Sequence, residues 1–394
     1  MQPRIFLIWT TMLAMAAGHC VGQTAAPADR QRQAALALEQ QGENAGAEAA
    51  WRMYLNAHPS SAEAYAHLGL LEARQERYKE AVPFYRKALV LDPKISGLRL
   101  NLGLALFKAA EMKDALQEFK PLLKSAPPSS PDRQRLTILI GMCYYGTEEY
   151  ALAAPYLKQA AAGDPRNLPL RLALAHSCLW SKQYQCVLDT YREILMLNAE
   201  SAEADMLAGE ALDELKDANG AIAQFRAAVK ADPTMPDVHF GLGYLLWSKH
   251  RYEEAVPEFE AELANNPNHV QAMAHLGDTD MKLSHPEAAV PLFEKAIKID
   301  PGLELAYLDL GIAYAATGRN DDALREMKAA ERLAPNDVDV HWRLGWLYRA
   351  MGDKDASKAE LDKAKNITQA ADTALVNKMS PHSAQAPPTV PEVK

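Results

Sequence analysis

Small and bulky apolar side chains recur along this chain in a fixed pattern. In seven segments an alanine is followed four positions later by a large apolar residue: Ala47/Trp51, Ala81/Tyr85, Ala115/Phe119, Ala153/Leu157, Ala221/Phe225, Ala255/Phe259 and Ala289/Phe293. Residues four apart lie about one turn apart, on the same face of an α-helix. Each segment therefore predicts a helix that buries one apolar face.

A recurring glycine, found ahead of every such segment except the first, marks a second helix. Its positions are 34 residues apart, with one step of 38 and one skipped copy: Gly69, Gly103, Gly141, Gly209, Gly243, Gly277, Gly311 and Gly345. A residue without a side chain lets this helix approach its partner closely. Prolines keep the same interval, at Pro59, Pro93, Pro127, Pro165, Pro233, Pro267, Pro301 and Pro335. They mark helix ends, because the residue before a proline is pushed out of helical conformation. A period of this size predicts a solenoid of stacked helix pairs.

These columns together resemble the tetratricopeptide repeat family. The stretch from Leu68 and Gly69 through Ala81 and Tyr85 to Pro93 matches a whole unit of that family. The resemblance covers residues 28–364 and implies an all-α fold, a right-handed α-solenoid of about ten helix-turn-helix units. The units are expected near residues 28–61, 62–95, 96–133, 134–167, 168–201, 202–235, 236–269, 270–303, 304–337 and 338–364.

Two departures from the repeat bear on packing. In the fifth unit Ala175, Val187 and Ala199 replace the usual glycine, alanine and proline, which predicts a local change of packing angle. The step of 38 places extra residues in 126–132, where prolines and serines mark a loop. A hinge between the third and fourth units is one interpretation. We favour a longer connector, because the helical pattern resumes in phase at once.

The N-terminal residues 1–22 predict a secretory signal. A basic start is followed by an apolar run from Ile5 to Ala17 and then by small residues. We therefore expect an exported protein, periplasmic or secreted. Lipoprotein anchoring at Cys20 is disfavoured, because His19 stands where such signals carry a small residue. No later segment approaches the ~20 uninterrupted apolar residues of a membrane span.

The C-terminal region lacks the repeat columns. One helical face in residues 366–379 stays largely apolar, formed by Ala371, Leu375, Val376 and Met379. We expect a capping helix there, covering the exposed end of the core. Residues 380–394 are rich in proline, alanine and serine and are expected to be disordered.

Three cysteines remain after removal of the signal: Cys143, Cys178 and Cys186. An oxidising compartment would permit a bridge between Cys178 and Cys186 across the turn of one helix pair. We favour buried, reduced thiols, because free cysteine packs as a small hydrophobic residue.

The chain shows none of the spacings that common catalytic sites require. His-Glu-x-x-His, Gly-x-Ser-x-Gly, phosphate-loop and dinucleotide motifs are absent, so no catalytic residue, cofactor or metal is predicted. His275, Asp278 and Asp280 could present metal ligands from one helix, but a solvated polar face is the preferred interpretation. A second acidic cluster consists of Glu210, Asp213 and Glu214. It suits acid–base chemistry or a basic partner, and an ordinary charged helix surface is favoured.

The resemblance implies that first helices of successive units line a concave groove. Residues three before, one after and four after each glycine share a face of the first helix. Candidate partner-binding residues on or beside this face are Phe107, Tyr145, His176, Trp180, Phe240, Tyr244, Trp247, Trp342, Arg343, Trp346 and Arg349. Aromatic side chains are frequent binding hot spots, whereas packing against the neighbouring unit is the alternative interpretation.

These features predict a non-enzymatic scaffold or assembly factor of the cell envelope that holds a protein or peptide. Two alternatives remain: a non-catalytic partner subunit of an enzyme complex, for example a protein-glycosylating one, or a glycan-binding protein that uses the groove aromatics. Some family members clamp the acidic C-terminus of chaperones with lysine and asparagine. Ala66, Leu70 and Leu100 stand in the corresponding stretches, so an apolar segment is the expected partner. The net charge of -9 argues against nucleic acid, and the oligomeric state is left open.

Overall fold

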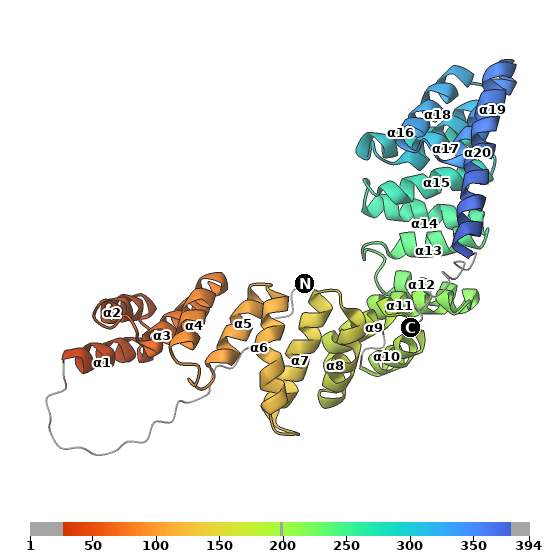
Figure 1. Ribbon diagram of the computed structural model, residues 1–394. Helices are drawn as coiled ribbons and strands as arrows, with labels where there is room; N and C mark the ends of the chain where they lie inside the picture. Colours follow the sequence, from red (N-terminus) through yellow and green to blue (C-terminus); the bar gives the residue numbers. More distant parts are fainter. Residues whose placement is uncertain (1–26, 198–199, 380–394) are drawn as a thin grey trace, which may run out of the picture. The chain divides into compact units, whose positions relative to one another are not determined.

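The computed structural model describes residues 27–197 and 200–379. Over these ranges it contains 20 α-helices and no strand (Figure 1). The chain divides into two compact units, the first ending at Asp217 and the second beginning at Ala218. The helices pair as the repeat predicts, and the fold class, an α-solenoid, is confirmed.

The first unit is a run of helix pairs in which each helix packs against the next one along the chain. Its helices are α1 (Pro27–Gln40), α2 (Asn44–Ala57), α3 (Ala62–Arg74), α4 (Tyr78–Leu91), α5 (Leu98–Lys108), α6 (Met112–Ser125), α7 (Pro131–Gly146), α8 (Tyr150–Gly163), α9 (Leu168–Trp180), α10 (Tyr184–Leu197) and α11 (Ala202–Glu214). First helices also lie beside one another, α3 next to α5 and α7 next to α9.

The second unit continues the same arrangement. Its helices are α12 (Ala218–Ala231), α13 (Val238–Ser248), α14 (Tyr252–Asn265), α15 (Val270–Lys282), α16 (Pro286–Ile299), α17 (Glu304–Ala316), α18 (Asn320–Leu333), α19 (Val338–Ala350) and α20 (Lys354–Met379). The first helices α13, α15, α17 and α19 lie side by side in that order. They form one continuous face, which we call the first-helix face of the second unit.

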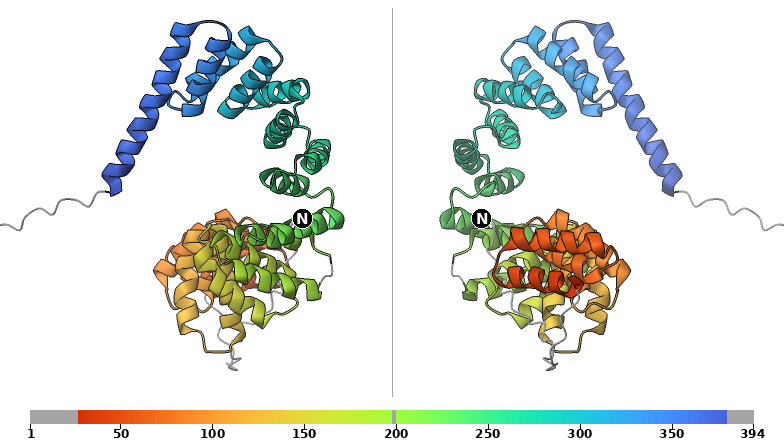
Figure 2. Two further views of the ribbon diagram at one scale, coloured as in Figure 1. Left: turned by 90° about the vertical axis from the view of Figure 1, so that its right-hand side faces the viewer. Right: turned by 90° about the vertical axis from the view of Figure 1, so that its left-hand side faces the viewer.

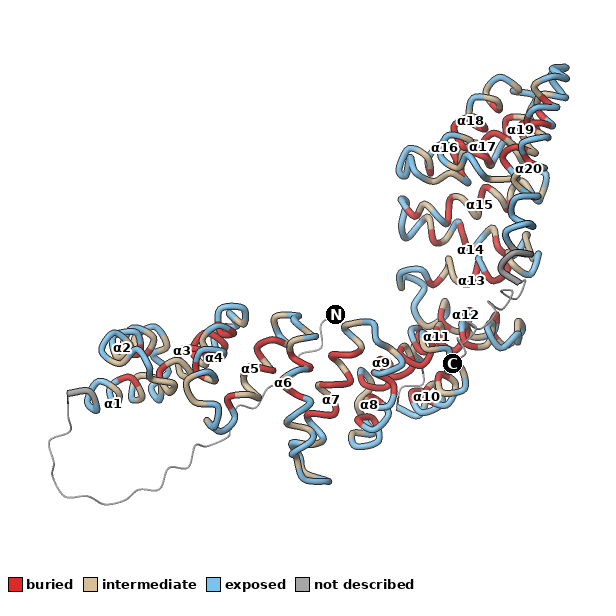
Figure 3. Tube along the Cα trace, in the orientation of Figure 1, coloured by how far each residue is buried: buried red, intermediate tan, exposed pale blue. Residues whose placement is uncertain are grey.

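The glycine column allows close contact between the two helices of a pair. A Cβ placed on Gly69 would lie 2.7 Å from Cδ1 of Tyr85, and one on Gly103 would lie 2.5 Å from Cε1 of Phe119. Real Cβ atoms do not approach so closely, so glycine is required for these rings to fit. The alanine and bulky columns are buried, and Figure 3 shows buried stretches where helices face their neighbours. This confirms the predicted packing of the helix pairs.

The turn after each first helix uses a left-handed residue seven positions after the glycine column. These residues are Gly42, Glu76, Ala110, Glu148, Lys182, Lys216, His250, Ser284, Gly318 and Gly352. A positive φ here reverses the chain directly after the helix. Most of these residues are not glycine, although a side chain disfavours this conformation.

The connector at 126–132 does not divide the chain. Helix α7 begins at Pro131, where the Ser130 side chain accepts a hydrogen bond from the Arg133 backbone N–H, and α6 packs directly against α7. The longer-connector interpretation is therefore confirmed. The division between compact units falls instead after Asp217, within the sixth repeat.

The expected capping helix over 366–379 is not a separate helix in the structure. Helix α20 runs without a break from Lys354 to Met379, because no glycine or proline interrupts this segment. It packs on α19, and Figure 2 shows it projecting beyond that helix. From residue 365 to 374 its side chains are exposed, except Ile367, which is half-buried. The side chains of Leu375, Val376 and Met379, expected to form the capping face, lie outside the described residues, so the capping role stays a prediction.

The cysteines of the fifth repeat form a disulfide, so the favoured reduced state is wrong for this pair. Cys178 in α9 and Cys186 in α10 have Cα atoms 5.9 Å apart and are bonded through their sulfurs. The tight turn between the two helices brings the residues within reach. Cys143 is a free, buried thiol, and burial raises its pKa to about 12.

Several predictions concern residues outside the described ranges. These are the signal at 1–22 with Cys20, Ala199 in the fifth repeat, and the tail at 380–394. None of the helices within 27–197 and 200–379 has the length and apolar character needed to cross a membrane.

Candidate functional site

An aromatic cluster occupies the start of the first-helix face of the second unit. Phe240, Tyr244 and Trp247 follow one another along α13, with ring centroids 6.1 and 5.6 Å apart. His275 of α15 reaches into the cluster, 5.2 Å from the Tyr244 ring and 4.8 Å from the Trp247 ring. Tyr244 remains 46% exposed. Three predicted site residues therefore lie together and leave aromatic surface open.

The indole of Trp247 links this cluster to a carboxylate. Its Nε1–H donates a hydrogen bond of 2.7 Å to Asp278 on α15. Lys282, one turn further along α15, lies 3.7 Å from the same carboxylate. Burial lowers the pKa of His275, so its imidazole is neutral near pH 7. The predicted solvated face is therefore wrong for His275, which packs among aromatic rings.

Asp309 is the next acidic group along this face, on α17. Within the described residues its carboxylate has no hydrogen bond and no ion pair within 4 Å. Burial raises its pKa to about 7, and the nearby charge of Asp278 adds to this rise. Lys282 and Arg343 act in the opposite direction. Asp309 is thus a half-buried carboxylate without a close partner.

A second aromatic patch lies on α19. The rings of Trp342 and Trp346 have centroids 6.0 Å apart, and the Arg343 guanidinium lies 5.6 Å from the Trp346 ring centroid. Nε of Arg343 is 3.5 Å from Asp339 but makes no hydrogen bond. Trp346 is 51% exposed, and Arg349 is also exposed. The predicted residues of α19 therefore form one accessible patch.

The predicted residues of the first unit form a smaller cluster. Tyr145 of α7 lies 6.0 Å from the His176 ring and 5.9 Å from the Tyr150 ring. Tyr150 in turn stacks on Trp180, which is 62% exposed. Phe107 packs against the core of this unit, as the alternative interpretation of internal packing expects.

Sequence reasoning missed His275 and Asp309 as members of the first-helix face. Both lie two positions before a glycine, an offset that was not among those used. Arg343 occupies the same offset in α19. A column of this kind is visible in the sequence once adjacent first helices are compared position by position. Tyr150 lies at the start of a second helix, where the pattern gave no reason to look.

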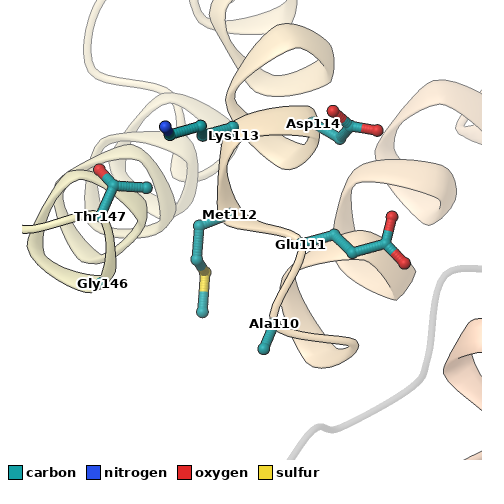
Figure 4. Close-up of a pocket in the computed structure, with 7 residues that line it drawn as sticks. All are labelled: Ala110, Glu111, Met112, Lys113, Asp114, Gly146 and Thr147. Carbon is teal, nitrogen blue, oxygen red and sulfur yellow. The ribbon is translucent and has the colours of Figure 1, made fainter.

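A hollow at the turn between α5 and α6 lies beside the end of α7 (Figure 4). It is lined by Ala110, Glu111, Met112, Lys113, Asp114, Gly146 and Thr147. Figure 4 shows the charged side chains of Glu111 and Lys113 pointing in opposite directions. This arrangement does not converge on a bound molecule, and it contains no predicted site residue.

Two clusters in the described residues have the composition of metal ligands: Asp237, Glu262 and His269, and Glu331, His341 and Glu360. In the second cluster Glu360 is surrounded by cations. Burial raises its pKa, but hydrogen bonds from Lys328, His341 and Lys363 lower it to about 2. In the first cluster, His269 caps α15 and lies 2.9 Å from Asp237. Both clusters are accounted for by ion pairs and helix capping.

Three family models match the chain, and each is described as a tetratricopeptide repeat. One matches residues 32–94, 188–236 and 240–304, a second matches 72–137 and 280–337, and a third matches 338–370. Together they cover most of the predicted array. The fourth repeat and the disulfide-bonded hairpin of the fifth lie largely outside these matches.

The chain is also similar to curated proteins described as BBSome complex member BBS4. The cattle protein (Bos taurus) is 25% identical over 202 residues, which is 51% of this chain and 38% of the relative. The frog protein (Xenopus tropicalis) is 28% identical over 146 residues, 37% of this chain and 28% of the relative. The similarity thus spans well under half the length of these two relatives.

Solved structures with similar folds include MamA and YrrB. MamA from Desulfovibrio magneticus is 21% identical, with a TM-score of 0.42, and the match covers 43% of this chain and 97% of that one. YrrB, titled a TPR protein with an unusual peptide-binding site, is 24% identical with a TM-score of 0.42. Its match covers 48% of this chain and 97% of YrrB.

Proposed function

Because this chain belongs to the tetratricopeptide repeat family, whose repeats build protein-binding scaffolds, we propose that it holds a partner polypeptide along its first helices. In this proposal the protein is exported and acts without catalysis, as a scaffold or assembly factor of the cell envelope. The partner contacts the first-helix face of the second unit.

The observation that carries this proposal is the exposure of large aromatic side chains on that face. Tyr244 and Trp346 are each about half exposed, although their neighbours Phe240, Trp247 and Trp342 are partly buried. Exposed aromatic rings on a rigid framework offer a large contact area at low entropic cost, and a partner that buries them gains most of its affinity there.

Two features support export. Residues 5–17 have the apolar run of a secretory signal. The disulfide between Cys178 and Cys186 belongs to a class of bond that persists in oxidising compartments. Expression with the signal should therefore yield an oxidised pair in the periplasm or medium. Free thiols at both positions in the native compartment would contradict export.

An assembly role is supported by the relatives described as members of the BBSome complex. Their similarity to this chain covers the repeat array only in part, so the identity of the partner is not transferred. The description of the relatives and the exposed aromatic face both support a function based on contacts with other proteins.

Site-specific photocrosslinking in cells of the native organism tests the proposal. A photoreactive residue at Tyr244 or Trp346 should form an adduct with one defined polypeptide, and Trp342→Ala should weaken it. The matched control is Asp321, exposed on the second helix α18, which should give no such adduct. Equal labelling from all three positions would contradict a role for this face. A shift of tryptophan fluorescence with sugars, without any protein adduct, would support the glycan-binding alternative.

A further inference from the structure

We propose that the second unit recognises a basic side chain, lysine or arginine, of its partner between two aromatic patches, through the carboxylates of Asp278 and Asp309. The inference rests on the proposed function, because it names the chemistry of the segment held there. The partner is a peptide segment in which one basic residue is flanked on both sides by apolar residues.

The order of groups along the face supports this arrangement. The cluster around Tyr244 lies on α13 and α15, and the patch of Trp342 and Trp346 lies on α19. Asp278 on α15 and Asp309 on α17 lie between them, because α13, α15, α17 and α19 are neighbours in that order. A segment that crosses these helices would meet aromatic, acidic and again aromatic side chains.

Asp309 differs from the paired carboxylates of this unit because it has no close partner within the described residues. Glu360 is bonded to Lys328, His341 and Lys363, and Asp322 is paired with two arginines. Asp309 has no such contact in the described residues and is half-buried. Leaving a carboxylate unpaired in a partly dry site costs stability. A cation supplied by a partner would remove this cost.

The four charges that face Asp309 cancel, so the ionised Asp309 carboxylate leaves this group with a net negative charge. From α15 these are Asp278 and Lys282, and from α19 they are Asp339 and Arg343. Lys282 is 3.7 Å from Asp278, and Arg343 is 3.5 Å from Asp339. Each cation thus has a nearer carboxylate than Asp309. A ligand cation would gain charge-assisted hydrogen bonds and contacts with aromatic faces.

The spacing of the helices sets the length of the peptide needed to test this proposal. Packed helices lie roughly 8–10 Å apart, and an extended peptide advances about 3.3 Å per residue. The basic residue should therefore stand roughly four residues from each apolar anchor. A displayed library of random peptides of about 10 residues is long enough to span the face.

The experiment selects this library on the full-length mature chain. We expect enriched peptides to carry lysine or arginine between apolar residues. Replacing that residue by glutamine should weaken binding at least tenfold, as should Asp309→Asn in the protein. Asp321→Asn makes the same charge change on an exposed part of α18 and should leave affinity unchanged. Thermal melts by circular dichroism establish that both variants fold.

The pH dependence gives a second readout. A bound cation favours ionised Asp309, so affinity should be full above pH 7 and fall by up to tenfold per pH unit below it. The Asp309→Asn variant should lose this dependence of affinity on pH. A merely structural defect would lower the affinity but would not remove its pH dependence.

The outcomes separate this inference from the proposed function. Enriched peptides that lack basic residues, or that bind Asp309→Asn as well as the wild type, would overturn the recognition of a cation. If their binding still required Trp342 and Trp346, the proposed function would stand. No enriched peptide, or peptides insensitive to alanine at both tryptophans, would overturn both.

Discussion

The first helices of the two units place different side chains on the same positions of the repeat. In the first unit these positions are largely aliphatic and pack against the core, as for Leu100, Leu104, Ile138 and Met142. In the second unit they carry aromatic and charged residues, and Trp346 is half exposed. The repeat therefore specifies the backbone, while side chains at the first-helix positions decide whether this face is packed in the core or exposed.

The columns that join the helices of a pair do not differ between the units. A Cβ on Gly103 would lie 2.5 Å from the Phe119 ring, and one on Gly243 would lie 2.8 Å from the Phe259 ring. Both rings are fully buried. The packing of paired helices and the proposed recognition thus use separate columns, and this separation can be tested in each unit.

The largest expected effect is common to both units. Phe119→Ala and Phe259→Ala should each lower the free energy of unfolding by about 3–5 kcal/mol, because each leaves a cavity between paired helices. Hydrogen–deuterium exchange should show lost protection in α5 and α6 for the first variant and in α13 and α14 for the second. In a repeat array such effects stay near the altered repeat. A much smaller loss in either unit would show that the two cores are built differently.

A smaller effect is specific to the first unit. Replacing Cys178 and Cys186 by serine removes a bridge that closes a loop of about nine residues, which predicts a loss of about 2–3 kcal/mol. Dithiothreitol should lower the thermal midpoint of the wild type by the same amount as the double substitution. Cys143→Ser in the free, buried cysteine serves as the control for burying a hydroxyl. If reduction leaves the midpoint unchanged, the bridge contributes nothing to the stability of α9 and α10.

The first helices of the two units are expected to differ in their effects on stability and on binding. Ile138→Ala in the first unit should cost about 1–2 kcal/mol, because this half-buried side chain packs on the core. Trp346→Ala should cost less than about 1 kcal/mol, since half of the side chain is exposed. The loss of partner capture should be larger for Trp346→Ala than for Ile138→Ala. Equal costs in stability would mean that Trp346 is core, as the internal-packing alternative holds.

The helix pairs could be predicted from the sequence because their packing needs particular residue sizes at particular spacings. Glycine at 69 and a large ring at 85 leave one arrangement in which the two helices fit. The same reasoning did not predict that the last helix continues from the final repeat as α20. The absence of helix-breaking residues after Lys354 lets that helix continue past its last neighbour, and apolar spacing alone does not show what the extra turns contact.

The candidate site was predicted in part. Aromatic residues such as Tyr244 and Trp346 stand out because of their type, whatever surrounds them. Asp309 does not, because an aspartate on a helix is ordinarily solvated, and only the neighbouring helices α15 and α19 make it a half-buried, unpaired carboxylate. The disulfide was judged wrongly for a similar reason: spacing permits the bridge, but only the turn between α9 and α10 brings the sulfurs together.

The smallest effect concerns the turns, where both units use the same backbone with different residues. Ala110 in the first unit has φ of 64°, and Gly318 in the second has φ of 79°. A side chain in this conformation costs about 1 kcal/mol, and no atom lies within 4 Å of a Cβ on Gly318. Ala110→Gly should therefore raise the free energy of unfolding by about 0.5–1 kcal/mol, and Gly318→Ala should lower it by a similar amount.

A matched control distinguishes this effect from a general effect of glycine. Ala370 is exposed within α20, so Ala370→Gly should destabilise that helix by about 1 kcal/mol at most. Urea titrations of the three variants compare the changes directly. If Ala110→Gly destabilises the protein as Ala370→Gly does, the left-handed turn is not a source of strain in the first unit. In that case the loops around the seven non-glycine turns accommodate a side chain at positive φ, and these residues do not lower the free energy of unfolding.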